Sequence, residues 1–430
     1  MKLWQKGATA HQKVDHFTVG NDRAYDLILA QYDCEASIAH AQMLGKIGLI
    51  SATEADQVTE VLSKIKSTTL NGEFSIEDHF EDMHSKIEHL LTEELGDLGK
   101  KIHTARSRND QVLVAMHLYI KDELSEIKKQ CISLFDLLIK LADKHQNDLI
   151  PGYTHLQVAM PSSVGLWLSA YAETLVDDLS FWHAAYQLSN QNPLGSAAGY
   201  GSSFPIDREY TTKLLGFDAL KINSVAAQMS RGKLEKSTAF ALASIGSTLA
   251  KLSMDVCLYM GQDFDFISFP DNLTTGSSIM PHKKNPDLFE LVRGKCNQLQ
   301  ALPNQLNLLT TNLPSGYHRE LQLAKGPIIE GIQELKSCLE ILCFSLEKIK
   351  VKKNITEQSK YDYLFSVDTL NAEVLKGVPF RDAYRDLGNK IEAGEFVPNR
   401  KVKHTHVGSI GHLGLDLIKA KMAPFRGSNE

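Results

Sequence analysis

The sequence has few of the features that mark nucleic-acid-binding, secreted or membrane-spanning proteins. A net charge of −6 over 430 residues argues against a nucleic-acid surface, which usually carries an excess of lysine and arginine. No apolar run reaches the ~18 residues that a transmembrane helix needs, and the first residues show no hydrophobic signal segment. We therefore expect a soluble, cytoplasmic protein that contacts neither nucleic acid nor membrane.

Disulfide, metal and nucleotide sites are not indicated either. The six cysteines contain no Cys-x-x-Cys pair, so reduced thiols are expected rather than disulfides or a zinc site. The glycine-rich segment 195–205 lacks the Lys-Ser/Thr of a phosphate-binding loop. His404, His406 and His412 could be read as a metal cluster, but no cysteine or paired carboxylate accompanies them, which favours a mobile, solvated tail.

Long heptad patterns dominate the middle of the chain. Apolar residues alternate steps of three and four over 120–141, 242–259 and 328–349, and 164–185 and 288–309 repeat the pattern with one polar interruption each. This spacing gives a straight apolar seam suited to near-parallel helix packing. We therefore predict an all-α fold with an elongated central bundle of five long helices.

The regions on either side of these seams have shorter patterns. We predict an N-terminal helical domain over residues 1–105, the long-helix bundle over 106–360, and a small helical domain with a tail over 361–430. In the first domain, Ser51-x-x-Glu54 and Ser75-x-x-Asp78 follow the pattern of capping boxes at helix starts.

Apolar residues also occur off the heptad seams, in greater number than the interior of one bundle requires. They include Phe135, Trp167, Phe240 and Phe289. We interpret these side chains as contacts between subunits, which predicts an oligomer.

Residues 276–285, Gly-Ser-Ser-Ile-Met-Pro-His-Lys-Lys-Asn, form the most informative stretch. Asn285, Pro286 and Asp287 match the residue preferences of a helix start, with Asn285 as the N-cap. The positive end of that helix and the neighbouring lysines create a site for a small anion, where a hydroxyl ionises more easily than in water. The alternative is a surface Ser/Gly loop that only caps the helix.

Three further polar segments stand at predicted helix ends. Residues 103–111, His-Thr-Ala-Arg-Ser-Arg-Asn-Asp-Gln, could clamp a carboxylate or form a solvated helix cap. Residues 152–157 place His155 in a short loop that Pro161 closes at the next helix start, where this histidine could transfer protons or serve the structure alone. Residues 317–325 hold polar side chains after a proline helix stop.

Taken in order, the motifs HTxRSRNDQ, GYTHLQ, PLGS, GSSxMPxKKNPD and a Tyr…Gln…Lys segment resemble the argininosuccinate lyases and their lens relatives, the delta crystallins. The resemblance lies within the fumarase/aspartase superfamily and covers roughly residues 2–390, with the opening Lys2-Leu3-Trp4 included. It implies β-elimination of argininosuccinate to arginine and fumarate, in arginine biosynthesis, without a metal or organic cofactor. It also implies a homotetramer that acts on a small-molecule substrate, with active sites drawn from three subunits.

The resemblance further implies a role for each motif residue. Ser277 would be the general base that removes a proton from the succinyl β-carbon, and Lys283 and Asn285 would stabilise the resulting aci-carboxylate. His155, oriented by Glu290, would help to protonate the departing nitrogen or act through water. The residues implied to hold the substrate are Ser107, Arg108, Asn109, Thr154, Tyr317, Gln322 and Lys325.

Two departures from the family pattern concern the substrate-holding side. Asp22 stands where the family usually has serine, and Ala324 stands where it usually has an acid, so we expect the same substrate in an altered binding geometry. Two alternatives stay open: a sister lyase for another N-succinyl substrate, and a catalytically silent structural homologue. Retention of His155, Ser277 and Lys283 argues against the catalytically silent homologue.

Overall fold

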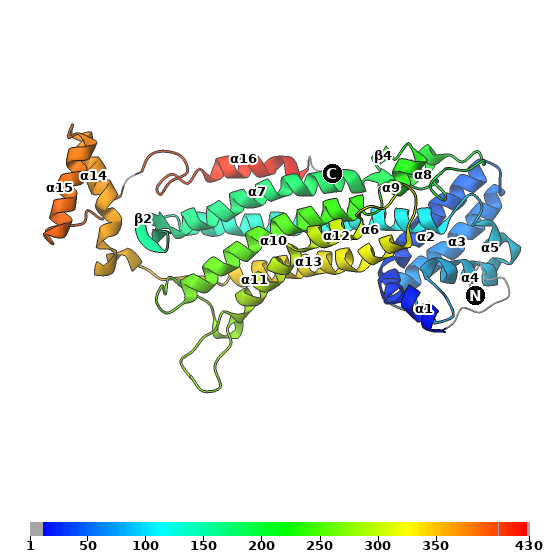
Figure 1. The fold of residues 1–430 in the computed structure, drawn as a ribbon, viewed down its shortest axis with the longest axis horizontal. Helices are drawn as coiled ribbons and strands as arrows, with labels where there is room; N and C mark the ends of the chain where they lie inside the picture. Colours follow the sequence, from blue (N-terminus) through cyan, green and yellow to red (C-terminus); the bar gives the residue numbers. More distant parts are fainter. Residues whose placement is uncertain (1–11, 403, 428–430) are drawn as a thin grey trace. The chain divides into compact units, whose positions relative to one another are not determined.

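The computed structural model describes residues 12–402 and 404–427, and the all-α prediction is confirmed (Figure 1). The opening Lys2-Leu3-Trp4 lies outside the described residues. The chain divides into two compact units, which we call the binding unit (residues up to 127, 180–244 and 298–335) and the loop unit (128–179, 245–297 and 336 onward). These two units are built from interleaved segments and do not correspond to the three consecutive domains predicted from the sequence, which stay a prediction.

Four of the five predicted long helices are continuous. They are α6 (Arg108–Lys144), α7 (Val164–Ser189), α10 (Lys233–Met260) and α13 (Lys325–Leu346). The prediction of one long helix over 288–309 is wrong, because that segment forms α11 (Asp287–Leu299) and α12 (Leu302–Leu309). Pro303 accounts for the break: it donates no N–H and its ring clashes with the carbonyl one turn back, so it stands in the first turn of α12.

The predicted seams form the core. Leu242, Ile245 and Leu249 of α10 are fully buried, and so α10 is a core helix although its length and composition would also suit a membrane span. Of the residues off the seams, Phe135, Trp167 and Phe289 are also buried within the chain, so interpreting them as subunit contacts was wrong. Phe240 is 56% exposed, and other large apolar side chains are exposed with it: Phe181 on α7, Leu291 on α11, Leu308 on α12 and Phe344 on α13.

Further helices complete the binding unit. They are α1 (Gln12–Val19), α2 (Asp22–Lys46), α3 (Ala52–Leu70), α4 (Met83–Leu95), α5 (Asp97–Lys101), α8 (Arg208–Leu214), α9 (Ser224–Met229) and the 3-10 segment η2 (Arg319–Ala324). The capping box at Ser51 is confirmed. The one at Ser75 is wrong: α4 begins after Asp82, which accepts from the Ser85 N–H at 2.8 Å. No helix begins at Ser75, and the Asp78 carboxylate instead accepts from Arg23 at 3.1 Å.

The loop unit contains a hairpin and the C-terminal helices. Its other elements are β1 (Leu149–Thr154), β2 (Gln157–Ser163), β5 (Ile267–Ser268) with its antiparallel partner β6 (Lys350–Val351), α14 (Ser366–Leu375), α15 (Phe380–Glu392), α16 (Leu415–Arg426), and 3-10 segments at 271–273, 355–357 and 359–365. In the binding unit, β3 (Gln191–Asn192) and β4 (Ala219–Leu220) pair in parallel.

The histidines near the C-terminus form no metal cluster within the described residues. His404 is partly buried, with Nε2 3.0 Å from Asp368 and Nδ1 2.6 Å from Ser409. The expectation of a solvated, mobile tail is therefore wrong for His404, because two side chains hold its ring. Further along, Arg426 of α16 pairs with Asp136 of α6.

Candidate functional site

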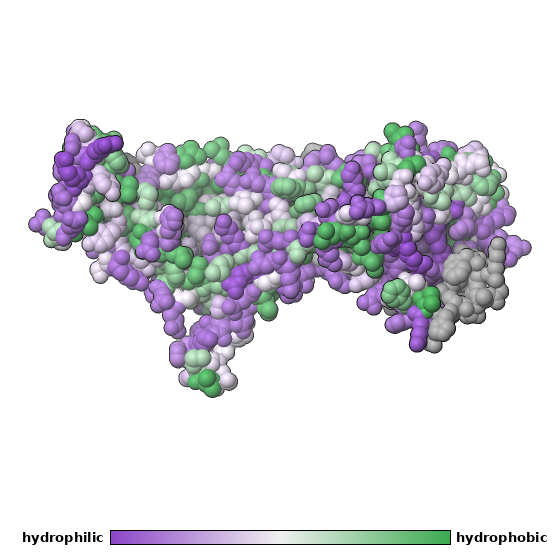
Figure 2. Space-filling model, in the orientation of Figure 1, coloured by the Kyte–Doolittle hydropathy of each residue, from purple (hydrophilic) through white to green (hydrophobic). Residues whose placement is uncertain are grey.

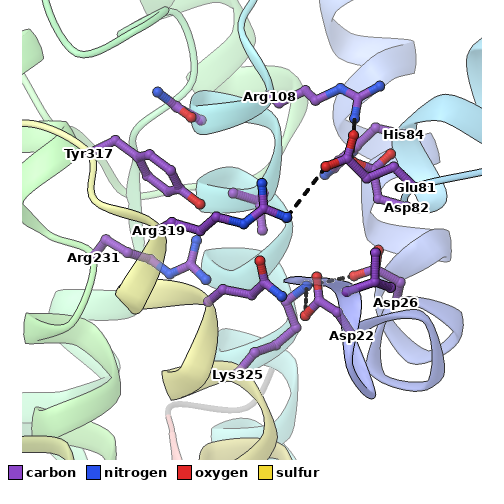
Figure 3. A pocket seen from close by; sticks show the side chains of 14 residues that line it. Asp22, Asp26, Glu81, Asp82, His84, Arg108, Arg231, Tyr317, Arg319 and Lys325 are labelled. Carbon is purple, nitrogen blue, oxygen red and sulfur yellow. Dashed lines mark hydrogen bonds and ion pairs between the residues drawn. The ribbon is translucent and has the colours of Figure 1, made fainter. Parts of the chain in front are cut away.

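A pocket of about 240 Å³ in the binding unit collects most of the predicted substrate-holding residues (Figure 3). It lies where α2, the start of α4, the start of α6 and segment 317–325 converge. The predicted residues that line it are Arg108, Asn109, Tyr317, Gln322 and Lys325. Ser107 does not line the pocket, and its hydroxyl accepts from the Asn109 N–H at 3.3 Å as part of the α6 start.

Lys325 is a buried cation of this pocket. Its side chain is 3% exposed, and its Nζ lies 2.6 Å from Asp26 and 2.8 Å from Asp22. Burial alone would lower the pKa of Lys325, but the two carboxylates outweigh burial and raise it. Burial raises the pKa of Asp22, and Lys325 opposes that shift. The departure at Asp22 therefore lies inside the pocket and places a second carboxylate on Lys325.

Ala324, the other departure, is fully buried and does not line the pocket.

The arginines that line the pocket are paired with acids as well. Arg108 lies 2.6 Å from Asp82, and Arg319 lies 3.4 Å from Glu81 (Figure 3). Arg231, in the turn between α9 and α10, lies 2.9 Å from Glu235. Cations and carboxylates thus alternate around one cavity, which suits a ligand that carries charges of both signs.

A buried ion network behind the pocket was not anticipated from the sequence. Asp33 of α2 is fully buried, 2.9 Å from Nδ1 of His84, which lines the pocket, and 3.7 Å from Arg106. Burial raises the pKa of Asp33, but His84 and Arg106 outweigh burial and lower it; burial lowers the pKa of His84, but Asp33 outweighs it and raises it. Polar residues seven apart on α2 (Asp26, Asp33 and His40) were the signal that could have revealed this face.

Asp110, inside the HTxRSRNDQ motif, anchors a neighbouring loop. Its carboxylate accepts from the backbone N–H groups of Ser107 at 2.9 Å, Ala197 at 3.1 Å and Gly195 at 3.3 Å. Burial raises the pKa of Asp110 to about 6, against the lowering effects of Arg106 and these three donors. Asp110 therefore ties the PLGS segment to the start of α6.

In the loop unit, His155 occupies a hairpin turn instead of the predicted loop. Thr154 pairs with Gln157, so His155 and Leu156 form a two-residue turn with φ angles of 54° and 58°. Pro161 pairs with Pro151 inside the hairpin, so the prediction that it closes the loop at a helix start is wrong. Such a turn normally carries Asn or Gly, and the left-handed region costs other residues roughly 1–2 kcal/mol each. Strain of this kind is typical of functional sites.

The 276–285 loop projects away from the helices of its unit (Figure 1), and Figure 2 shows hydrophobic surface at the tip of this projection. Ile279 of the loop is 83% exposed. The Ser277 hydroxyl accepts from the Ile279 and Met280 N–H groups at 3.3 and 3.2 Å. Asn285 does not cap α11 as predicted. It pairs with Thr275 across the loop base, with an N–H···O distance of 2.8 Å, and α11 begins at Asp287.

The structure thus separates the predicted residues into two groups. The pocket holds binding residues, whereas Thr154, His155, Ser277, Lys283, Asn285 and Glu290 all belong to the loop unit. Within the described residues of this chain, Glu290 faces Arg293 at 4.0 Å and no hydrogen bond joins it to His155. The orientation of His155 by Glu290 therefore stays a prediction.

Comparisons with known proteins agree with the sequence resemblance. The lyase family matches residues 9–301. An argininosuccinate lyase of Phocaeicola vulgatus is 52% identical, with 98% of this chain and 94% of that protein covered. One of Parabacteroides distasonis is 53% identical over 99% and 96%, and one of Thermotoga neapolitana is 40% identical over 90% and 98%.

Solved structures show the same fold at low sequence identity. EDDS lyase in complex with formate matches with a TM-score of 0.77 at 21% identity, covering 98% of this chain and 91% of that one. A class II fumarase from Schistosoma mansoni matches with a TM-score of 0.71 at 17% identity, covering 89% and 91%.

Proposed function

The chain belongs to the argininosuccinate lyase family, and from this premise we propose that it cleaves argininosuccinate by β-elimination to arginine and fumarate, a step of arginine biosynthesis. The observation that carries the proposal is the pocket in which Arg108, Asn109, Tyr317, Gln322 and Lys325 meet. Its mixed charges suit a substrate that has carboxylates at both ends and an ammonium group at one.

The chemistry is assigned to the loop unit. Ser277 removes a proton from the succinyl β-carbon, and the positive charge of Lys283 stabilises the carbanion, which is the larger requirement for a carbon acid. Asn285 adds a hydrogen bond to the aci-carboxylate that this carbanion forms. The C–N bond then breaks, its electron pair stays on the guanidino nitrogen, and His155 or a water molecule supplies the proton that completes arginine. No water is consumed, and fumarate leaves.

The binding half of the site is assigned to the pocket. Arg108 and Asn109 of the pocket hold the succinyl carboxylates together with Ser107 and with Thr154 of the loop unit, while Tyr317, Gln322 and Lys325 complete the enclosure. Asp22 and Asp26 flank Lys325, so this part of the pocket, which we call the anionic corner, carries a net negative charge. The arginine end of argininosuccinate binds there. Its ammonium group is the natural partner for that corner.

The active enzyme is proposed to be a homotetramer in the cytoplasm. Exposed apolar side chains on the long helices, such as Phe240 and Phe344, support assembly because large apolar surfaces rarely stay open to water. The exposed positions of His155 and Lys283 in a single chain also support a site completed by other subunits.

The direct test is to follow fumarate release from argininosuccinate, adenylosuccinate, malate and aspartate in parallel. We expect activity with argininosuccinate alone. Activity with another of these substrates would favour the sister-lyase alternative, and no activity with any of them would favour the silent homologue.

A further inference from the structure

The hairpin β1–β2, which carries His155, ends in an exposed turn. Every residue from Thr154 to Val158 is exposed, and Leu156 beside His155 is 80% exposed. The two turn residues have left-handed φ angles of 54° and 58°. A strained backbone persists only where the surrounding structure holds it, and a two-stranded hairpin alone is marginally stable in water. The strands below the turn must therefore be held by other parts of the loop unit.

The base of the hairpin is held by ion pairs and by a backbone hydrogen bond. Asp148, directly before β1, lies 2.6 Å from Nδ1 of His145 and 2.6 Å from Nζ of Lys353. Its backbone carbonyl accepts from the Val164 N–H at 2.9 Å, where β2 ends and α7 begins. These contacts fix the point at which the hairpin leaves the helices. They lie a full strand away from His155.

The pairing of the two strands shifts between the base and the turn. Pro151 pairs with Pro161, whereas Tyr153 pairs with Val158. Two residues of β2 therefore oppose Gly152, whose Cβ, if present, would stand 2.8 Å from a backbone carbonyl oxygen of β2. A bulge of this kind bends the strand and re-aims the residues beyond it. The direction of the turn thus depends on contacts made beyond the bulge as well as on the base.

Tyr153 provides such a contact between the bulge and the turn. It is half-buried and directly precedes the exposed residues. Its ring centroid lies 5.3 Å from that of Phe264, with the ring planes inclined at 58°. Aromatic rings within about 7 Å attract one another in tilted and edge-on arrangements. The ring of Phe264 therefore holds the hairpin two residues away from His155.

Phe264 is itself fixed by a buried aromatic cluster. Its ring centroid lies 5.5 Å from that of Phe266, which is fully buried, and 6.2 Å from that of Tyr259 at the end of α10. Tyr361, 3% exposed, joins the cluster from the 3-10 segment 359–365, with its centroid 6.4 Å from that of Phe266. The Phe264 N–H also donates to the Gly261 carbonyl at 3.1 Å. The core of the loop unit thus presents a fixed ring to Tyr153.

We propose that Phe264 is a positioning residue for His155, which acts through the ring of Tyr153 to aim the exposed turn. The inference rests on the proposed function, in which His155 helps to protonate the departing nitrogen. A displacement of about 1 Å caused far from the chemistry can cost ~10²-fold in rate, so a contact below the turn is able to control turnover. If Phe264 only filled the core, its loss would lower stability without a specific effect on His155.

Steady-state fumarate release from argininosuccinate gives the first test. Phe264→Ala should lower kcat about 10–100-fold with an unchanged KM, because the contact acts on His155 and on no residue of the pocket. Phe264→Leu, which keeps most of the apolar volume without the ring, should also lower kcat and replaces the alanine variant if that variant does not fold. Phe264→Tyr keeps the ring and should retain the wild-type kcat.

The matched control is Phe396→Ala. Phe396 is also a half-buried phenylalanine of the loop unit, and its ring stacks at 5.7 Å on Tyr363, which is exposed. Its loss removes a ring pair that does not include the hairpin, so kcat should stay at the wild-type value. An equal fall of kcat for Phe396→Ala and Phe264→Ala, or a wild-type kcat for Phe264→Ala, would overturn the proposal.

Mixed tetramers separate positioning from a general loss of stability. Ser277→Ala chains supply the intact histidine, and His155→Asn chains supply the intact serine. Phe264→Ala added to the Ser277→Ala chain should lower the activity recovered in the mixture. The same change added to the His155→Asn chain, whose hairpin has no histidine to aim, should leave the recovered activity unchanged. Equal losses for the two placements would show that Phe264 serves stability alone.

Hydrogen exchange followed by mass spectrometry reports on the hairpin without substrate. In full-length Phe264→Ala the amides of residues 149–163 should exchange faster than in wild type, while those of α6 should not change. Unchanged exchange of the hairpin would overturn the proposal. Faster exchange in a protein whose wild type releases no fumarate would contradict the proposed function and leave the contact between Phe264 and the hairpin standing.

Discussion

The pocket of the binding unit and the loops of the loop unit differ in how their charged groups are held. In the pocket, Lys325 is buried between two carboxylates and Arg108 lies against Asp82. In the loop unit, His155 and Lys283 are exposed, and the His155 backbone is strained. The pocket groups proposed to bind the substrate are thus held by partners within one chain, whereas His155 and Lys283, proposed for the chemistry, are exposed on loops.

This difference agrees with the roles proposed for the pocket, which binds the substrate, and for the loops, which carry out the chemistry. Paired, buried groups hold a fixed geometry because removing one partner leaves an uncompensated charge in a low-dielectric environment. Exposed loops can be completed by another surface, which then excludes water and strengthens every electrostatic interaction at the reacting atoms.

Replacing Ser277 by alanine should produce the largest effect on activity. The loss of a positioned base should lower kcat by ~10²–10⁴ with little change in the free energy of unfolding. Steady-state fumarate release with argininosuccinate measures it, and Ser278→Ala is the matched control in the same loop. A greater loss for Ser278→Ala would show that the base is assigned to the wrong hydroxyl.

Replacing Lys325 by methionine should have the largest effect on stability. Asp22 and Asp26 would be left without their shared cation, which typically costs about 3–5 kcal/mol for a buried pair. Urea denaturation gives the change, with Lys421→Met as control because Lys421 pairs with Glu173 on the exposed surface. Similar losses of unfolding free energy for Lys325→Met and Lys421→Met would contradict the prediction that the buried ion pair contributes more to stability than the exposed one.

The His84–Asp33 pair should make stability depend on pH from both sides. The pKa of Asp33 is lowered from 3.8, so its contribution is present above that value and is lost as pH falls through the folded-state pKa. The pKa of His84 is raised from 6.5, so its contribution is complete below that value and is lost as pH rises through the folded-state pKa. The wild-type advantage over Asp33→Asn should therefore peak between the two transitions, which urea midpoints across pH would reveal. A flat difference would contradict an ionised pair.

Replacing Asp22 by serine should have the smallest effect. Lys325 keeps Asp26, so the fold should persist, while the anionic corner loses one charge and the KM for argininosuccinate rises. The rise should lie between slight and about tenfold, because partly exposed pairs contribute little and desolvated ones more. An unchanged or lower KM would show that the charge of Asp22 does not contribute to substrate binding.

The sequence predicted the long helices because a heptad pattern reports burial directly. Leu242, Ile245 and Leu249 repeat often enough to outweigh local exceptions. The hairpin around His155 was missed because its strands are short and contain prolines at 151 and 161, residues that ordinarily argue against a strand.

The residues of the pocket were predictable from motifs, but their partners were not. Lys325 is 299 positions from Asp26, and no local pattern relates residues so far apart.

The central claim is that the proposed site is complete only in the assembly, where different subunits supply Ser277 and His155. Inactive Ser277→Ala and inactive His155→Asn chains should be denatured, mixed and refolded together, and fumarate release measured over a range of mixing ratios. Activity should reappear in the mixtures, because some sites then receive an intact serine and an intact histidine from different subunits. No recovery at any ratio, with tetramers formed, would mean that each site takes both residues from one chain.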